Sequence, residues 1–181
     1  QKSSLQQASL RSALKRKAYI YAEYLGGGFH IEAWKISIPD MSGNSYSTAI
    51  KSALKNSGVD RKSIDLLVPH GVATPVTDAY EAKAITDVFG KNPPKPFITA
   101  FKPYIGHNLG STALLETVIM LLSLENNVIP PTLNCQIPDS KLGISPVKDL
   151  IRTNLKTVMK TACGFAGYNG AAVFRKFKHE K

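Results

Sequence analysis

Residues 101–114 read FKPYIGHNLGSTAL, and they place a lysine and a histidine in front of a strongly apolar segment. The apolar character continues over 108–126, a run too short and too often interrupted to span a bilayer, so it predicts a core helix. An extended run over 97–101 ends directly before Lys102. Lys102 and His107 therefore stand between a buried strand and a helix, where α/β proteins commonly place active-site residues.

A second histidine ends another apolar run. Residues 66–71 read LLVPHG, so His70 follows a buried strand predicted over 64–68. A histidine at the carboxyl end of a strand lies where open α/β sheets bind ligands. A loop histidine that only caps backbone groups is the alternative for His70 taken alone. Two histidines and a lysine at the ends of strands and helices are compatible with one shared site. They are equally compatible with separate structural roles.

The position of His107 suggests a chemistry. It lies near the positive end of the macrodipole of the predicted helix, and that field disfavours an imidazolium. We therefore expect a neutral ring that donates one N–H, which suits stabilisation of a developing enolate or oxyanion. Lys102, five residues before His107, adds a positive charge on the same side of the predicted site. The alternative is that Lys102 and Glu116 form only a structural ion pair.

The hydrophobic pattern alternates between repeats of two and of 3.6 residues. It predicts an extended segment over 18–25, a bend or bulge at the three glycines 26–28, and a second extended segment over 29–36. Further strands are predicted over 64–68, 97–101, 158–163 and 171–177, and helices over 44–58, 77–90 and 108–126. Asp78 and Glu81 have the spacing of a capping box, and residues 130–153 show no clear periodicity.

The order β-α-β-α-β-α-β-β predicts the fold class. Strands that alternate with helices pair in parallel, and the closing strands suggest an antiparallel hairpin. We expect an α/β domain over 18–181 with three layers, α-β-α, and a mixed five-stranded sheet. Residues 1–17 are expected to form a peripheral helix or a linker.

Composition narrows the function classes. The chain is 43% hydrophobic and 20% charged, as folded globular domains are. Its formal charge of +10 suits nucleic acid or an acidic protein, but basic residues interleaved with exposed aromatics are absent, so we expect the protein partner. Two cysteines make no disulfide framework, which favours a cytoplasmic location. Because the first residue is Gln1, we expect a processed chain or a piece of a longer one.

Metal and nucleotide sites are poorly supported by the sequence. Neither HExxH nor Cys-x-x-Cys occurs, and we expect His30 and His179 at the surface. The glycines at 26–28 lack the spacing of a phosphate-binding loop. We expect no metal and no cofactor.

Four segments in order carry a family resemblance. They are HGVATP at 70–75, KPYIGH at 102–107, VIPPTLN at 128–134 and GFAGYN at 164–169. Together they resemble the carboxy-terminal half of β-ketoacyl-acyl carrier protein synthases, the condensing enzymes of fatty-acid and polyketide synthesis in the thiolase-like superfamily. The resemblance covers nearly the whole chain from about residue 18.

The resemblance implies a decarboxylative Claisen condensation of an acyl thioester with malonyl on an acyl carrier protein. His70 and His107 would assist decarboxylation and hold the thioester oxygen. Lys102 would pair with Glu116, and Phe165 would gate the site.

It also implies substrate contacts and partners. Thr74 would help to hold the phosphopantetheine arm, and Gly164 would contact the substrate. The partners would be the acyl carrier protein and an amino-terminal half of the synthase, with a homodimer at full length and neither nucleic acid nor a membrane span.

The chain departs from the family pattern at several positions. The nucleophilic cysteine of the family belongs to the amino-terminal half, and Cys135 and Cys163 look like small buried hydrophobes. Val72 replaces a threonine, Ala166 a glycine, and Tyr168 a threonine. We therefore expect the chain alone to be inactive, with its substrate preference open.

Two other functions remain open at this point. A non-catalytic partner that resembles a chain-length factor is favoured by Val72 and Tyr168, whereas His70, Lys102 and His107 argue against it. A basic α/β domain that binds nucleic acid would show an affinity that depends steeply on salt.

Overall fold

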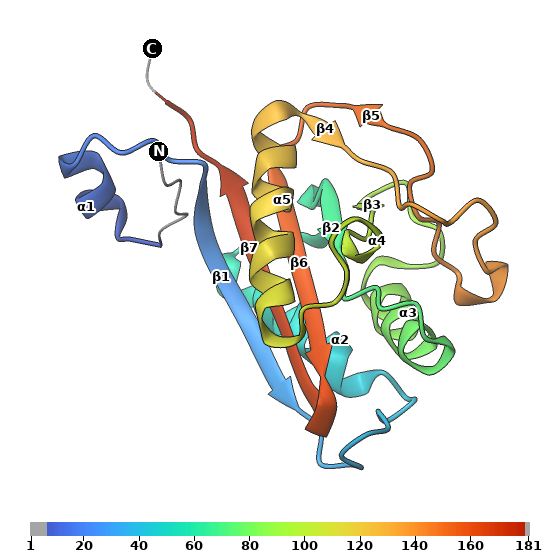
Figure 1. Cartoon of the computed structure of the whole chain (residues 1–181). Helices are drawn as coiled ribbons and strands as arrows, with labels where there is room; N and C mark the ends of the chain where they lie inside the picture. Colours follow the sequence, from blue (N-terminus) through green and yellow to red (C-terminus); the bar gives the residue numbers. More distant parts are fainter. Residues whose placement is uncertain (1–6, 180–181) are drawn as a thin grey trace.

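One mixed sheet organises the structure, a computed structural model that describes residues 7–179 (Figure 1). Its five strands lie in the order β1-β7-β6-β2-β3. β2 pairs in parallel with β3 and β6, whereas β7 pairs antiparallel with β6 and β1. The strand bounds are β1 Ala22–Ile31, β2 Leu66–Val68, β3 Phe97–Ile98, β6 Thr157–Gly164 and β7 Tyr168–Lys176. The predicted mixed sheet and its closing hairpin are confirmed.

Helices cover both faces of this sheet and make three layers. α2 (Asn44–Ser57) and α3 (Pro75–Phe89) pack on one face, and α5 (Thr112–Asn126) packs on the other. Successive side chains of β2 point to opposite faces, so Leu67 packs with α2 and α3 while its two strand neighbours pack with α5. The predicted α-β-α arrangement is confirmed.

β1 crosses the three glycines as one strand. Its register against β7 shifts between Tyr24 and Gly26, so the irregularity lies directly before the three glycines at which a bend or bulge was predicted. The extended segment predicted over 29–36 is wrong beyond Ile31. The partner strand β7 begins at Tyr168, opposite Ile31, and the N–H of the next residue, Glu32, donates to the carbonyl of Gly167 in the turn that joins β6 to β7.

α3 begins slightly earlier than the sequence predicts. Pro75 occupies its first turn and Thr74 its N-cap, because proline lacks the N–H that would remain unpaired there. The predicted capping box of Asp78 and Glu81 is therefore wrong. The Asp78 carboxylate accepts the N–H of Ala73 at 3.2 Å, and the Glu81 side chain is buried under the preceding loop.

The segment between β3 and α5 contains two short helical turns that were not predicted. α4 covers Lys102–Ile105, and the 3-10 turn η2 covers Leu109–Ser111. α5 consequently begins at Thr112 rather than at 108, and His107 lies in the loop between α4 and η2.

The remaining elements are short. α1 (Leu10–Lys15) buries none of its residues, as expected of a peripheral helix, while residues 1–6 of that predicted segment lie outside the described residues. A separate two-stranded sheet joins the two ends of the proline-rich stretch, which had shown no periodicity. Its strands are β4 (Val128–Ile129) and β5 (Ile151–Arg152). Elsewhere in the chain, single 3-10 turns are η1 (Arg61–Ser63), η3 (Ser140–Leu142) and η4 (Phe165–Gly167). None of the helices within 7–179 is long and apolar enough to cross a membrane.

A side chain at position 28 has no room between β1 and α2. A Cβ on Gly28 would lie 2.1 Å from the carbonyl oxygen of Ala49 and 2.6 Å from the backbone nitrogen of Ala53. We expect Gly28→Ala to lower the free energy of unfolding in urea by about 1–3 kcal/mol or more. Gly110→Ala is the control, because a Cβ there meets nothing within 4 Å. Equal stability of Gly28→Ala and the parent chain would contradict this packing.

Candidate active site

The loop that carries His70 is fixed by a buried carboxylate. Glu81 of α3 accepts the N–H of His70 at 2.7 Å and the N–H of Gly71 at 2.8 Å, one on each oxygen. The hydroxyl of Tyr46, in α2, donates to the same carboxylate at 2.6 Å. Burial raises the pKa of Glu81, and these three hydrogen bonds oppose the rise. Glu81 thus holds the end of β2 in one conformation.

Lys102 meets the same loop from the opposite side. Its ammonium group donates to the carbonyl of His70 and to Glu116 Oε1, the latter at 3.1 Å. Both side chains of this ion pair are buried. The expected pairing with Glu116 is therefore present, and it binds α4 and α5 to the loop at the end of β2.

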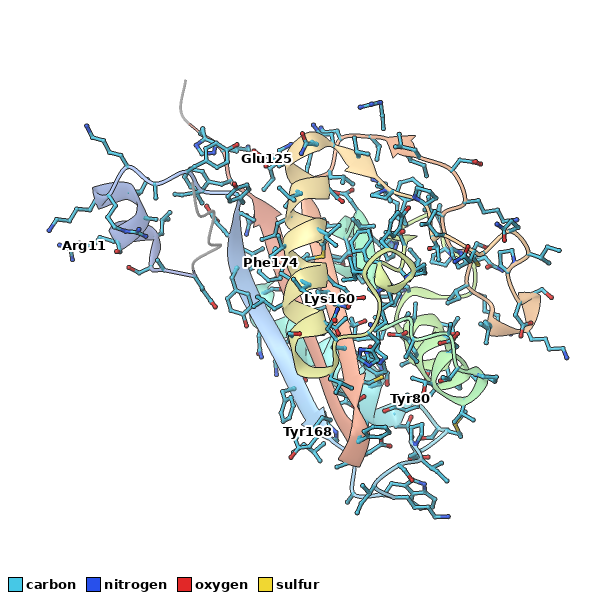
Figure 2. All side chains as sticks on the ribbon, viewed as in Figure 1. Arg11, Tyr80, Glu125, Lys160, Tyr168 and Phe174 are labelled. Carbon is cyan, nitrogen blue, oxygen red and sulfur yellow. The ribbon has the colours of Figure 1, made fainter. Side chains whose placement is uncertain are left out.

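A second lysine, which the sequence reasoning missed, completes this arrangement. Lys160 Nζ lies 2.7 Å from Glu116 Oε2, so that the Glu116 carboxylate stands between two ammonium groups. Figure 2 labels the Lys160 side chain in the interior, beside α5. Burial lowers the pKa of Lys160, and the charge of Glu116 opposes that effect. We call Lys102, Lys160 and Glu116 the Glu116 cluster.

The two predicted histidines converge. The ring centroids of His70 and His107 are 5.3 Å apart, and the rings meet edge to face at 82°. His107 Nδ1 lies 3.0 Å from the hydroxyl oxygen of Thr112, the first residue of α5. In the tautomer in which Nδ1 accepts the hydroxyl proton, Nε2 carries a proton and can donate it. The neutral state expected for His107 stays a prediction.

His70 stands in an environment that disfavours its charged form. Burial lowers its pKa to about 3, and the positive charges of Lys102 and Lys160, with His107, add to the effect. The ring is therefore neutral at physiological pH. It can donate a hydrogen bond from one nitrogen without carrying a charge.

Both imidazoles line one open cavity of about 870 Å³. The other predicted site residues that line it are Thr74, Lys102, Gly164 and Phe165. Phe165 is 75% exposed, and Thr74 is exposed at the start of α3. Glu116 is buried and is not among the lining residues, and its ion pair with Lys102 connects it to the cavity. Residues 7–179 hold no group of three or more histidine, cysteine or acidic side chains that could bind a metal ion.

Most of the positions that depart from the family pattern line this cavity or its neighbour. Val72 and Tyr168 line it, and Ala166 adopts a left-handed backbone with φ of 59°, which glycine tolerates better. Cys163 lines it too, but burial raises the pKa of its thiol far above the ordinary range. Cys163 is therefore a protonated thiol. Cys135 lines an adjacent cavity of about 530 Å³, and its lack of reactivity stays a prediction.

Comparison with known proteins decides the family. A family model described as "Beta-ketoacyl synthase, C-terminal domain" matches residues 21–136. The chain belongs to the β-ketoacyl synthase family. The resemblance read from the four sequence motifs is confirmed, and the chain corresponds to the carboxy-terminal, thiolase-like half of such synthases.

The individual relatives include a 3-oxoacyl-[acyl-carrier-protein] synthase and ketosynthases. The chain is 36% identical to 3-oxoacyl-[acyl-carrier-protein] synthase 2 of Coxiella burnetii over 168 residues, which cover 92% of this chain and 41% of the relative. Among solved structures, the ishigamide ketosynthase/chain length factor matches with a TM-score of 0.87 and 31% identity, over 93% of this chain and 41% of that one.

A second solved structure is a type II polyketide synthase acyl-carrier protein in complex with its ketosynthase bound to the hexaketide. It matches with a TM-score of 0.86 and 28% identity, over 94% of this chain and 42% of that one. The chain therefore spans about two fifths of the length of the relatives it matches.

The low pKa of His70 makes stability depend on pH. The unfolded imidazole binds a proton below about pH 6.5, whereas the folded one stays neutral down to about pH 3. The unfolded state binds more protons between these values, so stability falls as the pH drops through that window. We expect His70→Asn to lose less stability than the parent chain between pH 7 and pH 4.5 in urea unfolding. His179→Asn, at an exposed histidine, should keep the parent's pH dependence; identical losses in all three proteins would refute the assignment.

Proposed function

We propose that this chain supplies the two-histidine part of a 3-oxoacyl-[acyl-carrier-protein] synthase site. The single observation that carries the proposal is the convergence of His70 and His107 on one cavity. The reaction is the decarboxylative condensation of an acyl thioester with malonyl on an acyl carrier protein. Membership of the family supports it, because curated relatives carry the name of this activity.

The chemistry follows from neutral N–H donors. When the bond between the malonyl α-carbon and its carboxylate breaks, carbon dioxide leaves and the electron pair passes to the α-carbon and the thioester oxygen. His70 and His107 donate hydrogen bonds to that oxygen as its negative charge develops. The enolate then forms a new carbon–carbon bond to the acyl carbonyl, and the acylated thiol leaves as a thiolate.

The nucleophilic thiolate comes, in this proposal, from an amino-terminal half of the synthase. The protonated state of Cys163 argues against this residue as the nucleophile. Exposed apolar residues support a covering segment, because Phe165 at the cavity and Leu114 on α5 are 75% and 65% exposed. Such patches mark surfaces that another segment covers.

The partner of the site is an acyl carrier protein that delivers substrates on a phosphopantetheine arm. The net charge of +10 favours an acidic partner, and a matched ketosynthase structure holds an acyl-carrier protein. Thr74 and Gly164, which line the cavity, would contact the arm and the substrate. The family likeness favours a homodimer of the full-length protein, and the two unpaired cysteines fit a cytoplasmic location.

A partner that resembles a chain-length factor is the second candidate. One matched structure is a ketosynthase/chain length factor, and Tyr168 packs beside Phe29 with ring centroids 5.8 Å apart at the cavity. In that case the chain would shape an acyl pocket without forming an acyl-enzyme. An amino-terminal half with a cysteine at its nucleophile position would favour the enzyme, and a substituted position would favour the partner.

The role of the histidines can be tested by decarboxylation. We expect His70→Ala and His107→Ala, each combined with an amino-terminal half, to lower the rate of carbon dioxide release from malonyl-acyl carrier protein about 10²–10⁴-fold. The reason is the loss of a hydrogen bond that forms only as charge develops. His30→Ala is the control, since this exposed ring bonds to Ser45 on α2 and is not among the cavity's lining residues. Full decarboxylation activity of either His70→Ala or His107→Ala would refute the proposal.

The need for a second half can be tested separately. We expect the 181-residue chain alone to form no β-ketoacyl product, because its cavity-lining thiol is protonated. Product should appear when an amino-terminal half is added, as measured by mass spectrometry of the acyl carrier protein. Turnover by the chain alone would contradict the requirement for a nucleophile from outside it.

A further inference from the structure

Lys160 occupies a position that a lysine rarely takes. It is 4% exposed, in the middle of β6, and it is not among the lining residues of either cavity. Burying an ammonium group costs several kcal/mol unless nearby oxygens compensate for the lost water. A lysine at such a site needs oxygen acceptors around its ammonium group. The elements that supply these oxygens are the ones that the lysine links.

Four oxygens from three elements surround the ammonium group. Besides Glu116 Oε2 at 2.7 Å, Lys160 Nζ donates to the carbonyls of Pro69 and Thr161, both at 2.8 Å, and to that of Val68 at 3.4 Å. Val68 is also the register partner of Lys160 across the parallel pair β2–β6. Two of the four oxygens thus belong to the residues directly before His70.

We propose that Lys160 is a positioning residue, whose ammonium group ties Glu116 of α5 to the carbonyls of Val68 and Pro69 and so holds His70 in place for the reaction. The catalytic meaning of this inference rests on the proposed function. The link itself is a property of the fold. Lys102 holds the His70 carbonyl, and Lys160 holds the two carbonyls before it, with Glu116 as their common partner.

The ammonium group of Lys160 also adds a positive charge near the His70 ring. The charged and titratable groups around His70 are Lys102 on α4, Lys160 on β6, Glu116 on α5, Glu81 on α3 and His107. The Glu116 cluster carries one more positive than negative charge. Removal of Lys160 makes it neutral, and the protonated form of His70 then becomes less unfavourable, so the pKa of His70 rises from its value of about 3.

The experiment measures the protonated fraction of His70 by ¹⁵N NMR of the imidazole nitrogens between about pH 2.5 and pH 6, a window that contains the pKa of about 3. We expect His70 of Lys160→Met to titrate about one pH unit higher than in the parent chain, or more. Glu116→Gln in the Lys160→Met background restores the charge of the cluster, so the titration should return toward that of the parent. A lysine whose charge does not act on His70 would move the melting temperature and leave this titration unchanged.

Lys176→Met is the matched control. Lys176 also donates to a backbone carbonyl, that of Glu125, at 3.0 Å, but from β7 and toward the end of α5. This variant should leave the His70 titration where it is. Where Lys160→Met does not fold, Lys160→Gln, which keeps a donor without the charge, takes its place in the comparison. An unchanged His70 titration on removal of the charge overturns the inference.

A kinetic readout separates this inference from the proposed function. In decarboxylation assays with an amino-terminal half, Lys160→Met should lower kcat at least tenfold and leave KM near the parent value, because Lys160 is absent from the residues that line the cavities. If the parent chain shows no decarboxylation with an amino-terminal half while the His70 titration still shifts in Lys160→Met, the proposed function is refuted and the link stays intact. A fall in activity through KM alone would refute positioning.

Discussion

Two carboxylates buried at the end of β2 constrain the rest of the site. Glu81 and Glu116 are 3% and 0% exposed, and ions so deeply buried need partners because their desolvation costs several kcal/mol each. Glu81 takes the N–H groups of the loop after β2, and Glu116 takes the ammonium groups of Lys102 and Lys160. Glu81 therefore holds the loop by accepting its N–H groups. Lys102 and Lys160 hold it by donating to its carbonyls, and Glu116 compensates their charge.

This arrangement determines which chemistry His70 can perform. A ring whose pKa is about 3 is unprotonated at neutral pH, but it is also a weak base, so it removes a proton from a substrate poorly. Its remaining use is the N–H that the neutral imidazole always keeps. Beside His107, with ring centroids 5.3 Å apart, it would supply one of the two donors of the proposed reaction, and neither would need to reorganise when charge develops. A charge-developing oxygen suits such a site better than proton abstraction.

The sequence predicted the layers and the two histidines because both depend on local patterns. Periodicity marks the helices and strands, and a polar residue after an apolar run marks a strand end. The role of Lys160 was not predicted because a lysine in a strand usually faces water. Only the pairing of β6 with β2 under α5 buries this side chain. Glu81 was misread for a related reason. Its spacing from Asp78 fits a capping box, yet its carboxylate serves a loop that tertiary packing brings to it.

Cys163 extends the argument from the histidines to the nucleophile. Burial and the charge of Glu81 raise the pKa of its thiol, and the charges of Lys102 and Lys160 do not offset them. An apolar setting that keeps an imidazole neutral also keeps a thiol protonated, because both effects disfavour a new charge. In the proposed reaction the thiolate would therefore come from another segment, and the cavity that the exposed Phe165 and both imidazoles line is open to one. The proposal that donors and nucleophile lie on different segments is thus supported by the same electrostatics that keep His70 neutral and Cys163 protonated.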